Sequence, residues 1–421
     1  MHGGSKAIAS LLTELAADHA VALLCLRGRN EPGIDADVRG LCEYTCEIPR
    51  PWSYDNGRLR KAMRIVAGLA GGTPMWVRRT HAPEFTRQLQ QTVATWRPDI
   101  VQFEFHVMGQ YAVSPALSSV GRILVQHESG SAAAAETRGA HGAIAPVMAW
   151  ADSRAWPRYE RHVASLVDRV VTFTERDGTA LRRVSPHARI ATIPLGIRVP
   201  PAPLSPIGTE WCSVLFVGSF VHYPNEDAAI RLATRILPLV HRQLPLASLV
   251  IVGSDPPPSI SALAGTRARV HGSVPAVEPY LDRASLVVAP MRLGGGMRVK
   301  ILEALAAGKP VVCSPLAVDG LPVHDGIEVR LAETDEEFAK AIVELLENPG
   351  KRRALATAAR QWAEQHFGLH RSAAAFHRLY EDVLRERQPG GAAGLSGITV
   401  PVPQAADLMP GPGHIVNTPG A

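Results

Sequence analysis

Residues 289–320 of the chain read APMRLGGGMRVKILEALAAGKPVVCSPLAVDG. An apolar run ends in three consecutive glycines, after which an Ala-rich segment continues to Gly308 and a second apolar run follows Pro310. This order predicts a buried strand, a glycine turn, a short helix and a further strand. Glycines let the backbone approach a ligand closely, and the free N–H groups and the dipole at the start of a helix favour negative charge. The stretch therefore predicts a parallel α/β sheet with an anion site at this turn.

Three charged side chains follow the glycine turn. Arg298 and Lys300 fall in the first turn of the helix, where unpaired cations would oppose the helix dipole. An anionic ligand such as a diphosphate would resolve that conflict. Glu303 has two interpretations: it either forms an i, i+3 ion pair with Lys300, or it hydrogen-bonds the two ribose hydroxyls of a nucleotide.

Apolar runs typical of buried strands alternate with helical patterns along most of the chain, which predicts a parallel sheet flanked by helices. The runs begin at Val21, Ile100, Ile123, Val170 and Ile190 and, after a break, at Ser213, Ala247, Ala268, Ala284 and Pro310. The break, VPPAPLSPIG at 199–208, contains four prolines, which exclude both a helix and a central strand. Two doubly wound Rossmann-like domains are therefore expected, one on each side of a linker.

The predicted domain boundaries follow from this break and from the composition of the C-terminus. The last residues are rich in Pro, Gly and Ala without periodicity, which is typical of a disordered tail. We predict an N-terminal domain over 1–200, a linker over 201–208, a C-terminal domain over 209–366, a C-terminal helix over 367–388 and a tail over 389–421.

The N-terminus has an unusual order of elements. Gly3 and Gly4 directly follow the initiator region, and Ser5 is placed to cap a helix over Lys6–Asp18. A doubly wound domain usually opens with a buried strand that delivers such a glycine loop, and no run of that kind precedes it here. The first strand of this domain is therefore expected to be missing, with the true start codon upstream of Met1.

The overall composition is that of a globular protein, with 46% apolar and 20% charged residues. No run approaches the roughly 20 apolar residues needed to cross a bilayer, and the N-terminus lacks the regions of a secretory signal. A cytoplasmic location is therefore predicted. The five cysteines are odd in number and scattered, which predicts reduced thiols rather than a disulfide framework or a zinc site.

Positive charge is concentrated between Arg50 and Arg97, where nine Lys or Arg residues face two acidic ones. This segment has two interpretations: solvated arginines on an ordinary surface, or a patch that holds the protein peripherally at the anionic inner face of a membrane. Nucleic acid is not an expected partner, because no aromatic residues are interleaved in a basic motif.

Several ordered motifs together resemble family 4 of the retaining glycosyltransferases. The run from Ser213 to Gly320 resembles the nucleotide-sugar domain of a branch typified by GGGxRxKxLEAxAxGxPVV, and HGGSKAIASLL, QFEFHVMGQY and LVQHESG resemble the acceptor domain. The resemblance extends from Met1 to about Arg385. It implies a GT-B fold, in which two Rossmann-like domains face a cleft, and a donor that is a nucleotide-diphosphate sugar of the UDP or GDP type. It also implies retention of anomeric configuration, with no metal and no further cofactor.

The resemblance assigns roles to individual residues. Glu303 matches the second glutamate of the E-x7-E motif, which contacts the ribose, whereas the first would fall at Gly295. Relatives hold the diphosphate with an Arg and a Lys after the first strand of this domain; Arg298 and Lys300 are their expected substitutes. The expected donor-binding residues are Gly3, Gly4, Ser219, Gly294, Gly295, Gly296, Arg298, Lys300 and Glu303.

Two histidines are the expected catalytic residues. His127 matches the family's active-site histidine, which contacts the transferred sugar, and His106 follows another strand end, where ligands gather in open α/β sheets. No nucleophile is paired with a base, which fits a front-face mechanism in which the leaving diphosphate helps to deprotonate the acceptor. Asp35 and Asp37 imitate a metal-binding DxD motif, but they lie far in sequence from the glycine turn, and we interpret them as a decoy.

The sequence thus predicts a retaining glycosyltransferase that moves a sugar from a nucleotide diphosphate to an unidentified glycan, lipid or small-molecule acceptor. Two alternatives remain open. A nucleotide-sugar epimerase of the same fold would need no acceptor, and a non-catalytic sugar-nucleotide-binding subunit would bind the donor without turning it over.

Overall fold

The computed structural model describes residues 3–29, 31–50, 73–128, 130, 145–210, 212–294 and 299–388. The predicted tail over 389–421 and residues 51–72 of the basic segment lie outside these ranges. Within them, each of the ten apolar runs identified in the sequence contains a strand, so the predicted α/β rhythm is confirmed.

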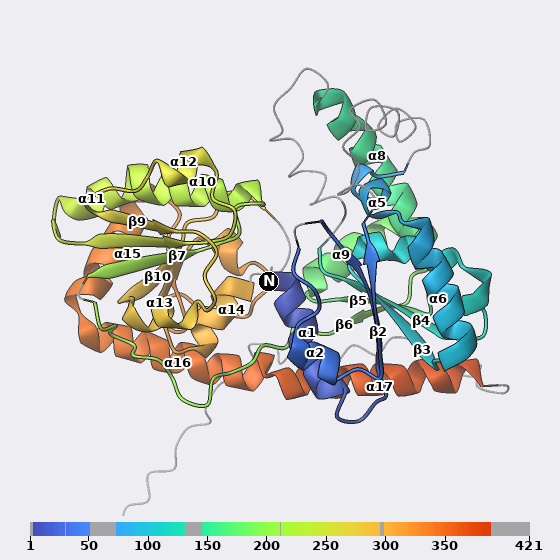
Figure 1. Cartoon of the computed structure of the whole chain (residues 1–421). Coiled ribbons are helices and arrows are strands. Elements are labelled where there is room, and N and C mark those ends of the chain that lie inside the picture. The colour runs from blue at the N-terminus through green and yellow to red at the C-terminus, as the bar shows by residue number, and fades with distance from the viewer. Residues whose placement is uncertain are drawn as a thin grey trace, which may run out of the picture.

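The described residues of the N-terminal half form six parallel strands in two sheets (Figure 1). One sheet pairs β1 with β2, and the other has the order β3-β4-β5-β6. The strands are β1 (Ala22–Arg27), β2 (Tyr44–Pro49), β3 (Ile100–Glu104), β4 (Gly121–Gln126), β5 (Arg169–Thr172) and β6 (Ile190–Thr192). The helices are α1 (Gly3–Leu15), α2 (Ala36–Gly40), α5 (Met75–Thr80), α6 (Pro83–Trp96), η1 (His106–Val113), η2 (Pro115–Leu117), α8 (Ala145–Ala164) and α9 (Glu175–Val184).

The C-terminal half contains one six-stranded parallel sheet of order β12-β11-β10-β7-β8-β9, with helices on both faces (Figure 1). Its strands are β7 (Ser213–Val217), β8 (Ser248–Val252), β9 (Ala268–His271), β10 (Leu286–Ala289), β11 (Val311–Cys313) and β12 (Arg330–Leu331). The strand order reverses between β7 and β10, which are hydrogen-bonded neighbours. In open α/β sheets, ligands bind at the carboxyl ends of the strands at such a switch point.

The helices of the C-terminal half follow the same alternation. They are α10 (Tyr223–Arg231), the π-helical turn η4 (Leu232–Ile236), α11 (Leu237–His241), α12 (Pro258–Ser261), α13 (Glu278–Arg283), α14 (Val299–Ala306), η5 (Pro315–Val318), α15 (Asp335–Glu347) and α16 (Pro349–Phe367). A capping box, in which Thr334 and Glu337 satisfy each other's backbone N–H groups, fixes the start of α15.

The final helix crosses back to the N-terminal half. Gly368 separates α16 from α17 (Leu369–Arg387), and the backbone of Ile197 hydrogen-bonds both Phe367 and Leu369. Figure 1 shows α16 along the C-terminal half and α17 along the N-terminal half, where α17 packs against α1 and β4. One apolar cluster accordingly joins residues of α1, β4, β5 and α17.

The two halves meet where α1 contacts α14 (Figure 1). Val299, the first residue of α14, packs against the apolar cluster that contains Leu11 of α1 and Phe173 after β5. A second contact is an ion pair between Arg176 of α9 and Asp319 after η5. The carboxyl ends of strands in both halves therefore lie on either side of this boundary.

Several local expectations are corrected. Helix α1 begins at Gly3 and ends at Leu15, so Ser5 lies inside its first turn and is not its N-cap. Strands β2 and β12 were not anticipated, because YTCEIP is half polar and the two-residue strand at Arg330 has no periodicity to read. Asp35 has a structural role, since its side chain accepts a hydrogen bond from the backbone N–H of Asp37 and caps α2.

All five cysteines are free. In the part of the chain that is described, no helix is both long and apolar enough to span a bilayer.

Candidate functional site

Lys300, in the first turn of α14, extends toward the switch point of the C-terminal sheet. Its Nζ donates a hydrogen bond to Oδ1 of Asn225 and lies 3.7 Å from Sδ of Met291. Nζ also lies 4.9 Å from the centre of the Phe216 ring. Phe216 belongs to β7 and Met291 follows β10, so the ammonium group lies where the strand order reverses. A cation is thus held where an open α/β sheet binds ligands.

The loop after β7 is braced around this ammonium group. Asn225 donates from Nδ2 to the carbonyl of Ser219 at 2.7 Å, and the hydroxyl of Ser254 donates to that of Ser219 at 2.9 Å. The described part of the loop after β10 runs to Gly294, whose φ of 98° lies in the left-handed region that strongly favours glycine. The loop after β7 is thus held by side-chain hydrogen bonds beside Lys300.

Glu303 lies one turn further along α14 and does not pair with Lys300. Within the described ranges, no hydrogen bond or ion pair reaches its carboxylate, and the amine of Lys300 is directed to Asn225 instead. Burial raises the pKa of Glu303, the charge of Lys6 in α1 opposes that rise, and Glu278 adds to it. The ion-pair interpretation of Glu303 is therefore wrong. The carboxylate is half-buried, keeps contact with solvent and has no partner within the described residues, so it is open to a ligand that brings hydroxyl groups.

Other predicted donor residues are placed less completely. Gly295, Gly296 and Arg298 lie outside the described residues. Gly3 and Gly4 form the first turn of α1, whose residue Lys6 acts electrostatically on Glu303. The N-termini of α1 and α14 thus belong to two helices in contact across the boundary between the halves.

His127, directly after β4, is held on three sides. Its Nε2 lies 2.7 Å from Oε2 of Glu104. The ring of Phe105 stacks on it at 4.1 Å between centroids and 23° between planes, and Phe173 meets it edge-on at 4.9 Å. Phe105 has a φ of 69°, which is rare for a side chain of this size and ends β3 abruptly. This strained turn lets two consecutive residues, Glu104 and Phe105, both contact one imidazole.

His106 follows Phe105 but its ring is enclosed. Its side chain is 1% exposed and lies between Trp76 and Trp156, with 4.9 Å from its centroid to each ring. Neither ring nitrogen has a hydrogen-bond partner in the described part of the chain. Burial, with the nearby His127 adding to it, lowers the pKa of His106 to about 3, so this ring is neutral. Of the two predicted catalytic histidines, only His127 keeps a polar contact.

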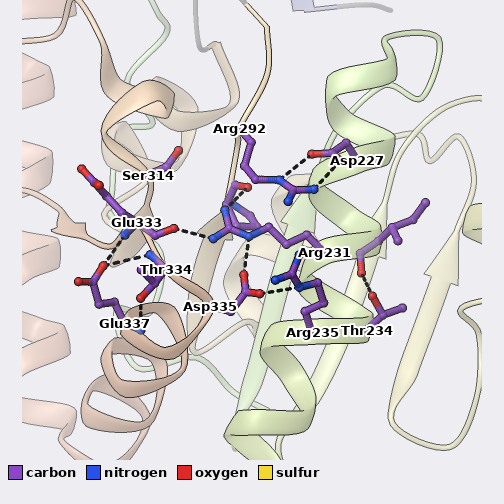
Figure 2. A network of polar contacts seen from close by, with 12 residues as sticks. Asp227, Arg231, Thr234, Arg235, Arg292, Ser314, Glu333, Thr334, Asp335 and Glu337 are labelled. Carbon is purple, nitrogen blue, oxygen red and sulfur yellow. Dashed lines mark hydrogen bonds and ion pairs between the residues drawn. The ribbon is translucent and has the colours of Figure 1, made fainter. Parts of the chain in front are cut away.

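A buried network supports the loop that leads to the glycine turn (Figure 2). Arg231 donates from Nε to Asp335 at 2.6 Å, from Nη1 to the carbonyl of Pro290 at 3.1 Å and from Nη2 to the carbonyl of Glu333 at 2.6 Å. Arg292 pairs with Asp227 through two nitrogens, and Figure 2 shows this pair beside Arg231. The network therefore ties residues 290–292, which precede the glycines, to α10 and to the start of α15.

Glu104, Arg231 and Asp335 were not predicted as functional residues. A signal for Glu104 was present, because Gln102 and Glu104 are two apart on a strand and so place two polar side chains on one face. Arg231 and Asp335 carried no such signal, since they come from elements that are 104 residues apart.

Comparisons with known proteins bear on the fold of the chain. Residues 212–348, about a third of the chain, match the family described as glycosyl transferases group 1. Sucrose-phosphate synthase from Thermosynechococcus elongatus has a similar structure, with a TM-score of 0.65 and 18% identity over 89% of this chain and 91% of that one. HepE from Anabaena, solved with UDP and glucose, has a TM-score of 0.60 and 14% identity over 86% of this chain and 100% of that one.

A glycosyltransferase from Rickettsia africae also matches, with a TM-score of 0.57 and 12% identity over 87% of this chain and 99% of that one. A sequence comparison with curated proteins found no match. The chain therefore has the GT-B fold, built from two Rossmann-like halves with parallel sheets.

Proposed function

We propose that this protein is a retaining glycosyltransferase of family 4 that transfers a sugar from a nucleotide-diphosphate sugar to a glycan, lipid or small-molecule acceptor. The GT-B fold and the family match of residues 212–348 support sugar transfer. The observation that carries the proposal is the arrangement of α14. Its first turn directs Lys300 to the switch point, and its next turn holds the half-buried Glu303, whose carboxylate has no partner within the described residues.

These two side chains suit the two ends of a nucleoside diphosphate. Lys300 would supply positive charge to the diphosphate, and Arg298, which is proposed from the sequence alone, would add to it. The carboxylate of Glu303 would accept hydrogen bonds from the ribose hydroxyls. Because fixed cations stabilise the charge that develops on the leaving diphosphate, the reaction would need no metal. HepE was solved with UDP and glucose, and on this analogy a UDP-type donor is our first choice, with a GDP type as the second.

His127 would face the transferred sugar from the other half. It follows β4, whose neighbour β5 leads to Phe173, and Phe173 belongs to the cluster that packs against Val299 at the start of α14. The histidine would thus contact the sugar that is attached to the diphosphate. The leaving diphosphate would then help to remove the proton of the acceptor hydroxyl.

Calorimetric titration of UDP, GDP, ADP and dTDP tests the donor site. Each charge-assisted hydrogen bond to a phosphate contributes about 1.5 to 3 kcal/mol, so Lys300→Ala or Arg298→Ala should weaken binding by about 10- to 150-fold. Lys340→Ala is the matched control, because Lys340 lies exposed on α15. Unchanged dissociation constants in folded Lys300→Ala protein would refute the site.

Donor turnover separates the proposed function from its alternatives. Incubation with the tightest-binding nucleotide sugar and a panel of acceptors should give a glycosylated product with the donor's anomeric configuration. A changed sugar without transfer would instead identify an epimerase. Tight binding with no turnover, even by hydrolysis, would indicate a non-catalytic binding subunit.

A further inference from the structure

A chain of hydrogen bonds runs from the C-terminal helix to His127. The hydroxyl of Tyr380 in α17 donates to Oε1 of Gln102 at 2.7 Å. Nε2 of Gln102 donates to Oε1 of Glu104 at 2.6 Å, and Oε2 of Glu104 lies 2.7 Å from Nε2 of His127. Burial raises the pKa of Tyr380, with the charge of Glu104 adding to it, so its hydroxyl keeps its proton.

The direction of each bond is fixed by the chemistry of the groups. An ionised carboxylate has only acceptors, so Nε2 of His127 must carry the hydrogen that Glu104 receives. Both oxygens of Glu104 are thereby occupied, one by Gln102 and one by His127. The imidazole is in addition held in its plane by the stacked ring of Phe105.

The other ring nitrogen of His127 is left available. Nδ1 makes no hydrogen bond within the described chain. It is not fully buried, so it keeps contact with solvent. In the neutral ring with a hydrogen on Nε2, Nδ1 is an acceptor. The exposed edge of the ring is therefore one that accepts a hydrogen bond from a hydroxyl.

We propose that Glu104 is a positioning residue that fixes the Nε2–H tautomer of His127, with Gln102 and Tyr380 holding Glu104 in place. His127 then presents Nδ1 as an acceptor to a hydroxyl of the transferred sugar. This inference rests on the proposed function, because it assumes that His127 faces the donor sugar. It also connects α17, through Gln102 and Glu104, to His127 in the N-terminal half.

Nitrogen-15 NMR of histidine-labelled protein measures the tautomer without any need for activity. The signals of His127 are assigned by their loss in His127→Gln. At pH 8 we expect a donor-type shift for Nε2 and an acceptor-type shift for Nδ1. Glu104→Ala should give mixed tautomers. Glu104→Gln should restore the Nε2–H form when its amide oxygen faces His127, with the amide of Gln102 turning over so that its oxygen accepts from the new NH2 group.

Kinetics test the consequence for transfer. Glu104→Ala should lower kcat by about 10- to 100-fold, the usual effect of losing a group that orients an active residue, with little change in KM for the donor. Tyr380→Phe should have a smaller effect of the same kind. Tyr111→Phe is its matched control, because it removes a buried hydroxyl that bonds the backbone of Thr80 and Ala82, outside the Tyr380–Gln102–Glu104–His127 chain.

The outcomes separate the two proposals. A wild-type His127 with its hydrogen on Nδ1, or with hydrogens on both nitrogens, would overturn the inference. So would a folded Glu104→Ala protein with an unchanged tautomer and an unchanged kcat. If the wild type transfers no sugar from any donor, the proposed function fails, and with it the role of His127 toward a sugar, whatever tautomer is found.

Discussion

Arg231 and Asp335 form an ion pair with 2.6 Å between Nε and Oδ1, and their side chains are only 4% and 9% exposed. Asp335 also pairs with Arg235 at 2.6 Å, so one carboxylate serves two guanidinium groups. Asp335→Asn should destabilise the protein by about 3 to 5 kcal/mol, because Arg231 would stay buried without its counter-charge. Chemical denaturation measures this loss. Asp382→Asn breaks a more exposed pair with Arg385 and should cost under about 1 kcal/mol; equal losses in the two variants would contradict the prediction.

Lys309 connects the linker to the C-terminal sheet. Its side chain is fully buried, and Nζ donates to the carbonyls of Ser205 in the linker and Ala284 before β10. Lys309→Met should lower the free energy of unfolding by about 1 to 3 kcal/mol, because it leaves these buried carbonyls unpaired.

The pH dependence of the same variant tests the buried amine. Burial lowers the pKa of Lys309 to about 8, although the charge of Asp282 acts the other way. Between about pH 8 and pH 10.5 the folded state then binds fewer protons than the unfolded state, so this group makes stability rise with pH. The free energy of unfolding of wild type minus that of Lys309→Met should therefore increase over this range. A difference that shrinks with rising pH would show that the folded state favours the charged amine.

Glu303→Gln should separate stability from binding. Burial raises the pKa of Glu303 because it disfavours the ionised form in the folded state. The contribution of this group to the free energy of unfolding therefore falls as the pH rises from the ordinary pKa of a glutamate through the raised pKa of the folded state. Without nucleotide at pH 8, the free energy of unfolding of the variant should exceed that of wild type by up to about 1 kcal/mol, and its unfolding temperature should be higher. This difference in the free energy of unfolding should shrink as the pH is lowered toward 5. Its affinity for the nucleoside diphosphate should fall. A variant that is less stable at pH 8 would mean that the carboxylate has a structural partner.

The basic segment from Arg50 to Arg97 should attract anionic membranes if it is an interaction patch. Flotation with vesicles that contain anionic lipid should recover more protein at low salt than at physiological salt, where the Debye length is about 8 Å. Vesicles of neutral lipid alone are the control. Equal recovery with the two kinds of vesicle would favour the interpretation of these residues as solvated surface arginines.

The sequence by itself determined the order and type of most elements. Ten apolar runs each contain a strand, and α14 ends at Ala306, just before Gly308, where the residues indicate. Local interactions decide these features, because strand and helix periodicity, proline and glycine act within a few residues. Position alone also placed His127 after a strand and Lys300 in the first turn of a helix.

Only the tertiary structure decided which of these residues meet. Glu303 does not pair with Lys300, because the amine of Lys300 donates its hydrogen bond to Asn225, which is 75 residues away in the sequence. The contact of Glu104 with His127 required β3 and β4 to be neighbours, and Tyr380 reaches Gln102 across 278 residues because α17 returns to the first half. Buried polar groups must find partners wherever packing brings them, so their pairing is a property of the whole fold. The residue types of the site could therefore be predicted in part from the sequence, whereas the contacts between them were set by the packing of distant segments.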